Sequence, residues 1–153
     1  MKELSLSSAD LSELLDSLLK NHCLQGIKVL CKGYSMSPFI RSEDTVVIKP
    51  IRDSAILKVG DIVAVPRNGK KHFIIHRIIK LTEDSLLLKG DNLYQSDGWF
   101  KKKEILGIID EKINKAGNSH RLRPTVNYLI ALGSRTGFLQ ASLSFMRKVK
   151  NKK

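Results

Sequence analysis

The chain has 153 residues, with 27 Lys and Arg against 15 Asp and Glu, which gives a formal net charge of +12. This length can bury a core without disulfides, and an apolar fraction of 42% excludes a wholly disordered chain. The charge favours anionic partners such as nucleic acid, anionic lipid or an acidic peptide, but it selects no fold.

Residues 1–25 predict an amphipathic N-terminal helix, because their leucines recur at helical spacing. Ser7 and Asp10 resemble a capping box at its start. Acidic residues interrupt the segment and argue against a secretory signal. We expect this helix to dock on the rest of the chain, on a partner or on a membrane surface.

Residues 26–115 predict a mainly β, antiparallel domain. Short apolar runs bounded by turn-forming or charged residues lie at 27–31, 45–49, 61–65, 73–81, 85–89 and 105–110. No helix-length pattern separates them, which favours antiparallel strands over βαβ units. Arg67-Asn68-Gly69-Lys70 predicts a hairpin turn, and Cys31 in its apolar run predicts a buried thiol.

Residues 116–153 predict a basic C-terminal helical extension that begins after Pro124 and is broken by Gly133 and Gly137. Its apolar stretch carries Arg135 near the middle, which costs roughly 2.5–3.5 kcal/mol on insertion, so we do not expect it to span a bilayer. We expect a cytoplasmic protein without a membrane anchor. Its basic C-terminal segment would allow peripheral contact with an anionic membrane.

The stretch KGYSMSP places Ser35 either in a structural turn or in the position of a nucleophile. A serine nucleophile needs a neighbouring base. His72 and His76 lie four residues apart on one predicted strand and therefore share a face. Asp91 and Asp97 follow in a polar loop, where each is either a turn former or the acid that orients an imidazole. Local pattern alone leaves both interpretations open.

Several ordered blocks together resemble the type I signal peptidases and the related LexA-type peptidases. The blocks are GYSMSPFIRSEDTVVI, GDIVAV, HFIIHRIIKL, and LKGDN followed by Asp97, and they cover roughly residues 29–110. The sequence is most similar to the archaeal and microsomal branch, which has a Ser-Met-x-Pro box, a Gly-Asp-Ile-Val strand, a His-Arg pair and a Lys-Gly-Asp-Asn loop. The resemblance implies the corresponding fold and serine endopeptidase activity on a peptide, leader or precursor protein, without metal or cofactor.

The resemblance also implies roles for individual residues. Ser35 would be the nucleophile, His76 the general base and Asp97 the acid that supports the imidazole. Residues expected to shape the surrounding site are Arg77, Asp91 and Asn92.

The serine turn itself carries three further expectations. Gly33 stands where some relatives supply a hydroxyl to the oxyanion, so another donor must join the Ser35 backbone N–H, while Gly33 still permits close approach of a substrate. Met36 is expected to pack beneath the nucleophile and Pro38 to stiffen the exit from the turn. Glu43 replaces a glycine that is usual in relatives, so the conformation of that turn is open.

A histidine base suits neutral pH better than a lysine. A free imidazole titrates near pH 6.5, whereas a lysine near 10.4 must be lowered by roughly three units. Lys70, Lys71 and Lys80 all lie in charged or turn surroundings. His76 is therefore the preferred base and His72 the second choice. The rate is expected to rise through a limb near pH 6–7, whereas a limb above about 8 would indicate lysine.

Two other classes of function remain open at this stage. One is a non-catalytic binding module with the same fold, acting at a membrane surface or on a partner. The other is a LexA-like self-cleaving regulator, which is disfavoured because no helix-turn-helix length precedes the β domain. Nucleic acid is a disfavoured partner.

Overall fold

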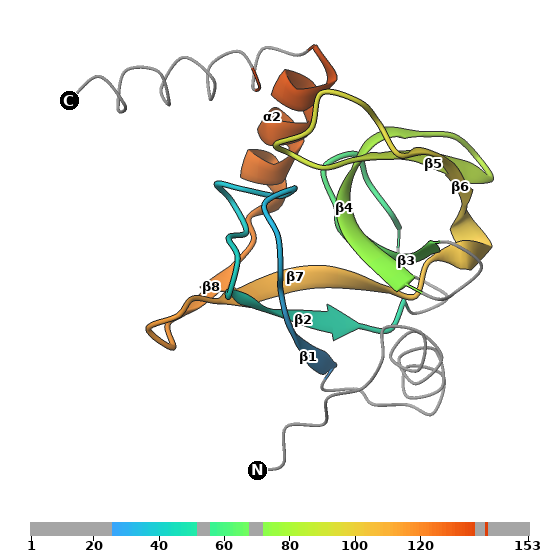
Figure 1. Cartoon of the computed structure of the whole chain (residues 1–153). Coiled ribbons are helices and arrows are strands. Elements are labelled where there is room, and N and C mark those ends of the chain that lie inside the picture. Colours follow the sequence, from blue (N-terminus) through green and yellow to red (C-terminus); the bar gives the residue numbers. More distant parts are fainter. Residues whose placement is uncertain (1–25, 52–55, 68–71, 137–139, 141–153) are drawn as a thin grey trace.

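A strongly curled antiparallel sheet dominates the computed structural model, which describes residues 26–51, 56–67, 72–136 and 140 (Figure 1). The predicted N-terminal helix and the basic run at 147–153 lie outside these residues. The described strands are β1 (Ile27–Leu30), β2 (Thr45–Lys49), β3 (Ile62–Arg67), β4 (His72–Leu81), β5 (Ser85–Lys89), β6 (Gly98–Lys101), β7 (Gly107–Ile113) and β8 (Ser119–Arg121). The described helices are the 3-10 helix η1 (Lys102–Glu104) and the α-helix α2 (Pro124–Arg135).

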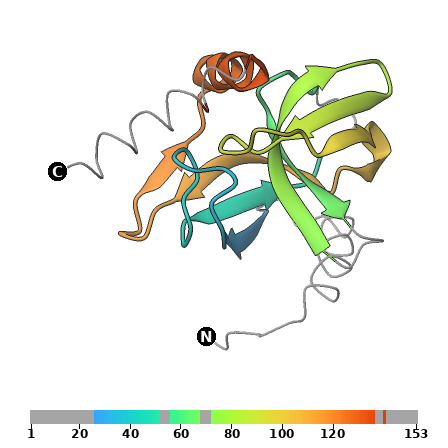
Figure 2. The same ribbon diagram turned by 45° about the horizontal axis from the view of Figure 1, so that its top comes forward.

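The sheet has the strand order β1-β2-β7-β3-β4-β5-β6, and β8 pairs with β7 beside this path. Every pairing is antiparallel. The sheet curls so that β4, β5 and β6 turn back over β3, while α2 lies across one end next to β4 (Figures 1 and 2). In the described part of the chain, no helix is both long enough and apolar enough to cross a bilayer.

Strand β3 separates two hydrophobic clusters, which explains its continuous apolar sequence. Ile62 and Ala64 belong to one cluster, and Val63 and Val65 belong to the other. Successive strand residues point to opposite faces, so a strand that is buried on both faces reads as an unbroken apolar run. Met36, from the segment between β1 and β2, packs into the first cluster. The serine segment is thereby attached to the core.

The mainly antiparallel β fold predicted from the sequence is confirmed. All six apolar runs form strands, whereas β6 and β8 were not predicted. The sheet continues through β8 to Arg121, beyond the predicted domain limit at residue 115. The predicted break at Gly133 is wrong, because α2 runs through this residue and ends at Arg135. Packing against the domain outweighs the low helix propensity of one glycine, which is about 1 kcal/mol.

The turn before β2 holds Glu43 at a φ of 71°, in the left-handed region that favours glycine. A glycine would adopt this conformation without the steric cost that a side chain brings. Replacing Glu43 with glycine is expected to raise the free energy of unfolding by about 0.5–1 kcal/mol. Glycine adopts the left-handed conformation without the steric cost of a side chain, and the larger conformational entropy of glycine in the unfolded chain cancels only part of this gain. Urea denaturation measures the change.

Glu43→Ala is the matched control for this turn. It removes the ion pair between Glu43 and Lys115 but keeps a side chain in the left-handed conformation. Alanine should therefore bring no stabilisation. Equal stabilisation by alanine and glycine would show that the backbone conformation is not the cause.

Candidate active site

Ser35 lies in a tight turn between β1 and β2, and the turn is held from below by Met36. The Met36 side chain is only 5% exposed. The backbone N–H of Ser37 donates to the Tyr34 carbonyl at 3.1 Å, and that of Ile40 donates to the Met36 carbonyl at 3.0 Å. Ser35 itself is half-buried. The turn therefore presents a partly accessible hydroxyl on a backbone that is anchored to the core through Met36.

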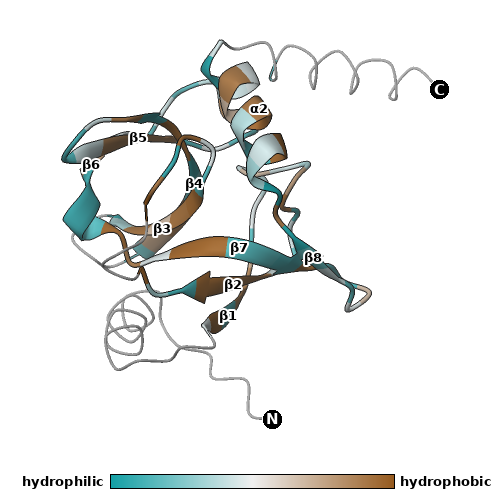
Figure 3. Cartoon of the chain, turned by 180° about the vertical axis from the view of Figure 1, so that it is seen from behind, coloured by the Kyte–Doolittle hydropathy of each residue, from teal (hydrophilic) through white to brown (hydrophobic). Residues whose placement is uncertain are grey.

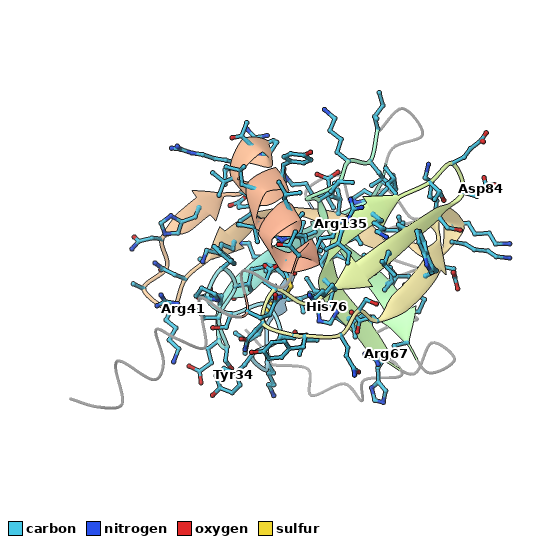
Figure 4. The ribbon with its side chains drawn as sticks, turned by 90° about the horizontal axis from the view of Figure 1, so that it is seen from above. Tyr34, Arg41, Arg67, His76, Asp84 and Arg135 are labelled. Carbon is cyan, nitrogen blue, oxygen red and sulfur yellow. The ribbon has the colours of Figure 1, made fainter. Side chains whose placement is uncertain are left out.

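The Ser35 hydroxyl, the His76 imidazole and the Asp97 carboxylate form a continuous hydrogen-bonded chain. His76 Nε2 lies 2.9 Å from Ser35 Oγ, and His76 Nδ1 lies 2.5 Å from Asp97 Oδ2. The side chains of His76 and Asp97 are each 5% exposed. His76 comes from β4, which Figure 4 shows from above, and Asp97 immediately precedes β6. The structure thus brings the three predicted residues together, while their catalytic roles stay predictions.

This geometry selects one tautomer of the imidazole. A carboxylate can only accept hydrogen bonds, so Asp97 requires the proton of a neutral His76 to be on Nδ1. The lone pair on Nε2 then faces the hydroxyl of Ser35. An imidazole in this tautomer can take a proton from serine, which is the arrangement that a serine nucleophile requires.

Arg67 is a member of the site that sequence reasoning missed. Its Nη1 donates to Asp97 Oδ1 at 3.1 Å, on the carboxylate oxygen that does not contact His76. The Arg67 side chain is 50% exposed, whereas that of Asp97 is 5% exposed. Arg67 ends β3, where the sequence had predicted only a hairpin. The contact depends on the hairpin register, which places Arg67 opposite His72.

Arg77, the residue after His76 on β4, forms a fully buried ion pair with Asp91. Arg77 donates from Nε and Nη2 to the two carboxylate oxygens of Asp91, each at 2.7 Å, and from Nη1 to the carbonyl of Gly60 at 2.9 Å. Both side chains are 0% exposed. Burial raises the pKa of the Asp91 carboxyl, and the Arg77 guanidinium opposes this shift.

The loop that follows Asp91 connects this pair to the serine turn. The backbone N–H of Asn92 donates to the Ser35 carbonyl at 2.8 Å, and Asn92 Nδ2 donates to the Tyr34 carbonyl at 3.0 Å. A Cβ on Gly90 would lie only 2.8 Å from the same Ser35 carbonyl, so this close approach requires glycine. Asn92 thus holds the backbone of the serine turn, while the site-shaping roles expected for Asp91 and Asn92 stay predictions.

A pocket of about 220 Å³ opens beside Ser35 and His76. One wall is formed by residues 29–33 and the other by residues 73–75 of β4. Gly33 lies in the first wall with a φ of 102°. Apart from Gly33 and its two chain neighbours, no atom of the described residues lies within 4 Å of the place where its Cβ would be. The space beside the Gly33 backbone is therefore open, and the role of Gly33 in substrate binding stays a prediction.

Two other predicted residues lie at the margins of the site. Pro38 follows a cis peptide bond and lines a second pocket on the far side of the serine turn. His72, the alternative base, is exposed at the start of β4. Among the described residues, no group of three or more His, Cys, Asp or Glu could hold a metal ion.

Cys31 lines the same pocket but is poorly suited to act as a nucleophile. Burial and then the nearby Asp44 carboxylate raise the pKa of its thiol from 9.0 to about 11. Because the thiolate is the reactive form, Cys31 is expected to resist iodoacetamide at pH 7.5, with labelling increasing only as the pH approaches 11. Peptide mapping by mass spectrometry measures this. Rapid labelling of Cys31 at neutral pH would contradict it.

Comparison with known proteins agrees with this architecture. The sequence model of the family described as Peptidase S24-like matches residues 12–110, which is more than half of the chain. A search among curated proteins found no significant match. The matched region includes β1 to β6 and all three residues of the Ser35–His76–Asp97 chain. The protein belongs to the Peptidase S24-like family.

Proposed function

We propose that the protein is a serine endopeptidase that cleaves a peptide, leader or precursor protein, with chemistry like that of the archaeal and microsomal signal peptidases. The observation that carries this proposal is the hydrogen-bonded chain from Ser35 through His76 to Asp97. Both ring nitrogens of the imidazole are engaged in the directions that proton transfer requires. A cytoplasmic location is part of the proposal, and the free thiol of Cys31 fits a reducing compartment.

The reaction would proceed through an acyl-enzyme. His76 Nε2 takes the proton of Ser35 as its Oγ forms a bond to the peptide carbonyl carbon, and Asp97 stabilises the resulting imidazolium. The imidazolium then gives that proton to the leaving nitrogen as the C–N bond breaks. In the second half, water attacks the ester carbonyl carbon and loses a proton to the same imidazole. The imidazolium returns that proton to Ser35 Oγ as the acyl C–O bond breaks and the acid product leaves. The backbone N–H of Ser35 and a second donor would hold the oxyanion.

Two unpaired strand edges explain how an extended peptide would reach the serine. In the described part of the chain, β1 pairs only with β2, and β5 pairs with β4 only from Arg77 onward. Residues 72–76 of β4 therefore have one free edge, and residues 29–33 form the opposite wall of the pocket. A peptide that adds as a strand would satisfy these backbone groups and place its carbonyl near Ser35.

Substrate profiling with a peptide library tests the proposal. The wild-type chain is expected to cleave a subset of extended peptides, whereas Ser35→Ala should cleave none. Ser37→Ala is the matched control, because it changes a serine of the same turn outside the hydrogen-bonded chain. Cleavage that persists in Ser35→Ala would refute the mechanism. No cleavage by any folded variant would favour the non-catalytic binding module.

Membership of the S24-like family also favours a second candidate, self-cleavage as in LexA-type peptidases. Intact mass spectrometry of the purified chain over time distinguishes the two. A self-cleaving regulator would lose mass at a rate independent of its concentration, and Ser35→Ala would stay intact. An endopeptidase acting on other chains would remain at full mass while it cuts the library.

A further inference from the structure

Helix α2 exposes an apolar face to solvent. Val126, Tyr128, Leu129 and Leu132 are between 45% and 65% exposed, and they project from one broad side of the helix. We call these four residues the α2 outer face. Figure 3 shows brown, hydrophobic segments of α2 alternating with paler, more polar ones. Scattered exposed leucines are ordinary, but four large apolar side chains on one helix face indicate an interaction surface.

The opposite side of α2 packs against the β domain. Asn127 and Ser134 are buried there together with Ile130 and Ala131. The helix thus buries two polar side chains while it exposes larger apolar ones, which is the reverse of the usual pattern for a surface helix. Its outer face is therefore not required for the packing observed within the chain.

Two contacts prevent α2 from rolling to bury its outer face. Lys89 Nζ donates to the Ser134 carbonyl at 2.6 Å, so a buried cation binds the last turn of the helix. Nearer the start of the helix, a Cβ on Gly60 would lie 2.7 Å from the backbone nitrogen of Tyr128, which shows how closely the chain at Gly60 approaches the helix. The orientation of α2 is fixed, and the apolar residues stay outside.

The described charged residues of α2 and of the two residues before Pro124 are all basic. Residues 121–153 contain eight Lys and Arg and no Asp or Glu. Arg121 and Arg123 are exposed just before α2, and Arg135 is exposed in its last turn. Arg121 Nη2 lies 4.0 Å from Asp110 Oδ2, which is a loose ion pair. The apolar face is thus flanked by cations at both ends of the helix.

A second pocket at the start of α2 combines the same two properties. It has a volume of about 440 Å³ and is lined by Arg41, Arg121 and Arg123 together with Leu122 and Val126. One acid also lines it, Asp44, whose Oδ2 accepts from Lys112 Nζ at 3.4 Å and from the Arg41 backbone N–H at 2.9 Å. The exposed cations of this pocket are therefore available to an anionic group beside apolar chains.

We propose that the α2 outer face docks on the surface of an anionic phospholipid bilayer. The twelve residues of α2 extend for about 18 Å, so the helix would lie in the interface with its leucines in the acyl boundary and Tyr128 at headgroup level. The flanking arginines would contact lipid phosphates. A second copy of the chain fits less well, because two such faces would bring like charges together.

Docking would hold the candidate active site beside the bilayer. α2 packs next to β4, which carries His76 (Figure 4). The second pocket also includes Pro38 of the serine turn and Arg77 of β4. Precursor peptides held at a membrane would then be within reach. The docking itself does not depend on the catalytic assignment, because binding can be measured with the Ser35→Ala chain.

Co-sedimentation with vesicles tests the proposal on the full chain. Vesicles of phosphatidylcholine with 30% phosphatidylglycerol are compared with pure phosphatidylcholine at about 0.1 M salt. The wild-type chain is expected to bind the anionic vesicles at least about tenfold more strongly. Leu129→Gln/Leu132→Gln should weaken this binding by about tenfold or more, and Arg121→Gln/Arg123→Gln should weaken it severalfold. Circular dichroism checks that each variant is folded.

Trp99→Gln provides the matched control, because Trp99 is a large apolar side chain, 54% exposed, on the distant strand β6. Its binding should stay within about twofold of wild type. Trp99 is also the only tryptophan in the chain, so Trp99→Phe/Tyr128→Trp places a single fluorophore on the outer face. Its emission should shift to the blue with anionic vesicles and be quenched by brominated lipid.

Three results would overturn the proposal. The first is unchanged vesicle binding in Leu129→Gln/Leu132→Gln, which would assign membrane contact to another part of the chain. The second is an unshifted emission from the tryptophan at position 128. The third is absence of vesicle binding combined with a dimer that Leu129→Gln/Leu132→Gln converts to monomer, which would identify the face as a contact between copies.

Discussion

Replacing His76 with glutamine, or Ser35 with alanine, is expected to lower kcat by about 10⁶-fold on a peptide substrate of the wild-type chain. Either change removes the proton transfer between the two groups, which lie 2.9 Å apart. Asp97→Asn should lower kcat by about 10⁴-fold, because an amide would favour the wrong imidazole tautomer. Steady-state kinetics on a peptide from the library screen measure each loss.

The double variant Ser35→Ala/His76→Gln provides the control for a shared mechanism. Residues that act as a unit lose their effect together, so the double variant should be no slower than either single one. Losses that multiply in the double variant would show that the two groups work independently. Loss on Ser35→Ala with full activity in His76→Gln would assign the base to another residue.

Replacing Arg67 should lower kcat less than replacing Asp97, and a lysine should restore most of the loss. It contacts Asp97 and not the serine or the imidazole, and half of its side chain is exposed, so water can replace much of the contact. Arg67→Gln is expected to lower kcat by about tenfold or less, with most of the activity restored in Arg67→Lys. A loss as large as that of Asp97→Asn would make Arg67 as important as the carboxylate.

Removing one partner of the buried Arg77–Asp91 pair is expected to have the largest effect on stability. Arg77→Met leaves the Asp91 carboxylate without its two hydrogen bonds at 2.7 Å, in a site that is 0% exposed. Breaking such a pair costs about 3–5 kcal/mol, because an uncompensated charge stays buried. Urea denaturation, followed by circular dichroism, measures the free energy of unfolding.

Two controls separate the buried charge from lost packing. Arg77→Met/Asp91→Leu removes both charges and should recover most of the stability, since apolar replacements of buried pairs are often neutral. Lys49→Gln breaks a half-exposed pair with Asp110 and should cost at most about 1 kcal/mol. A cost for Arg77→Met no larger than that for Lys49→Gln would show that the buried pair does not stabilise the fold.

The strands that could be predicted are those whose own side chains carry the signal. β2 and β5 match their apolar runs, because their residues are buried and bounded by turns. β8 reads SHR and is exposed at every position, so its strand conformation comes from pairing with β7 rather than from its sequence. β6 alternates between half-buried and exposed residues over only four positions, too few to establish a period.

The candidate site shows a similar division. Ser35, His76 and Asp97 are far apart in sequence, and only the resemblance to a known family grouped them before the structure showed their contacts. Arg67 has an exposed side chain beside a hairpin signal, so its contact with Asp97 follows from strand register alone. The contact between Lys89 and the end of α2 likewise needs the folded arrangement of two distant elements.

Covalent labelling with a fluorophosphonate tests most directly whether Ser35 is a nucleophile activated by His76. The full chain is incubated with the probe at pH 7.5, and the adduct is located by peptide mapping. One adduct on Ser35 is expected in the wild-type chain and in Ser37→Ala, and none in Ser35→Ala or His76→Gln. Labelling that persists in His76→Gln, or that maps to another residue, would contradict the assignment of this serine and histidine as the catalytic pair.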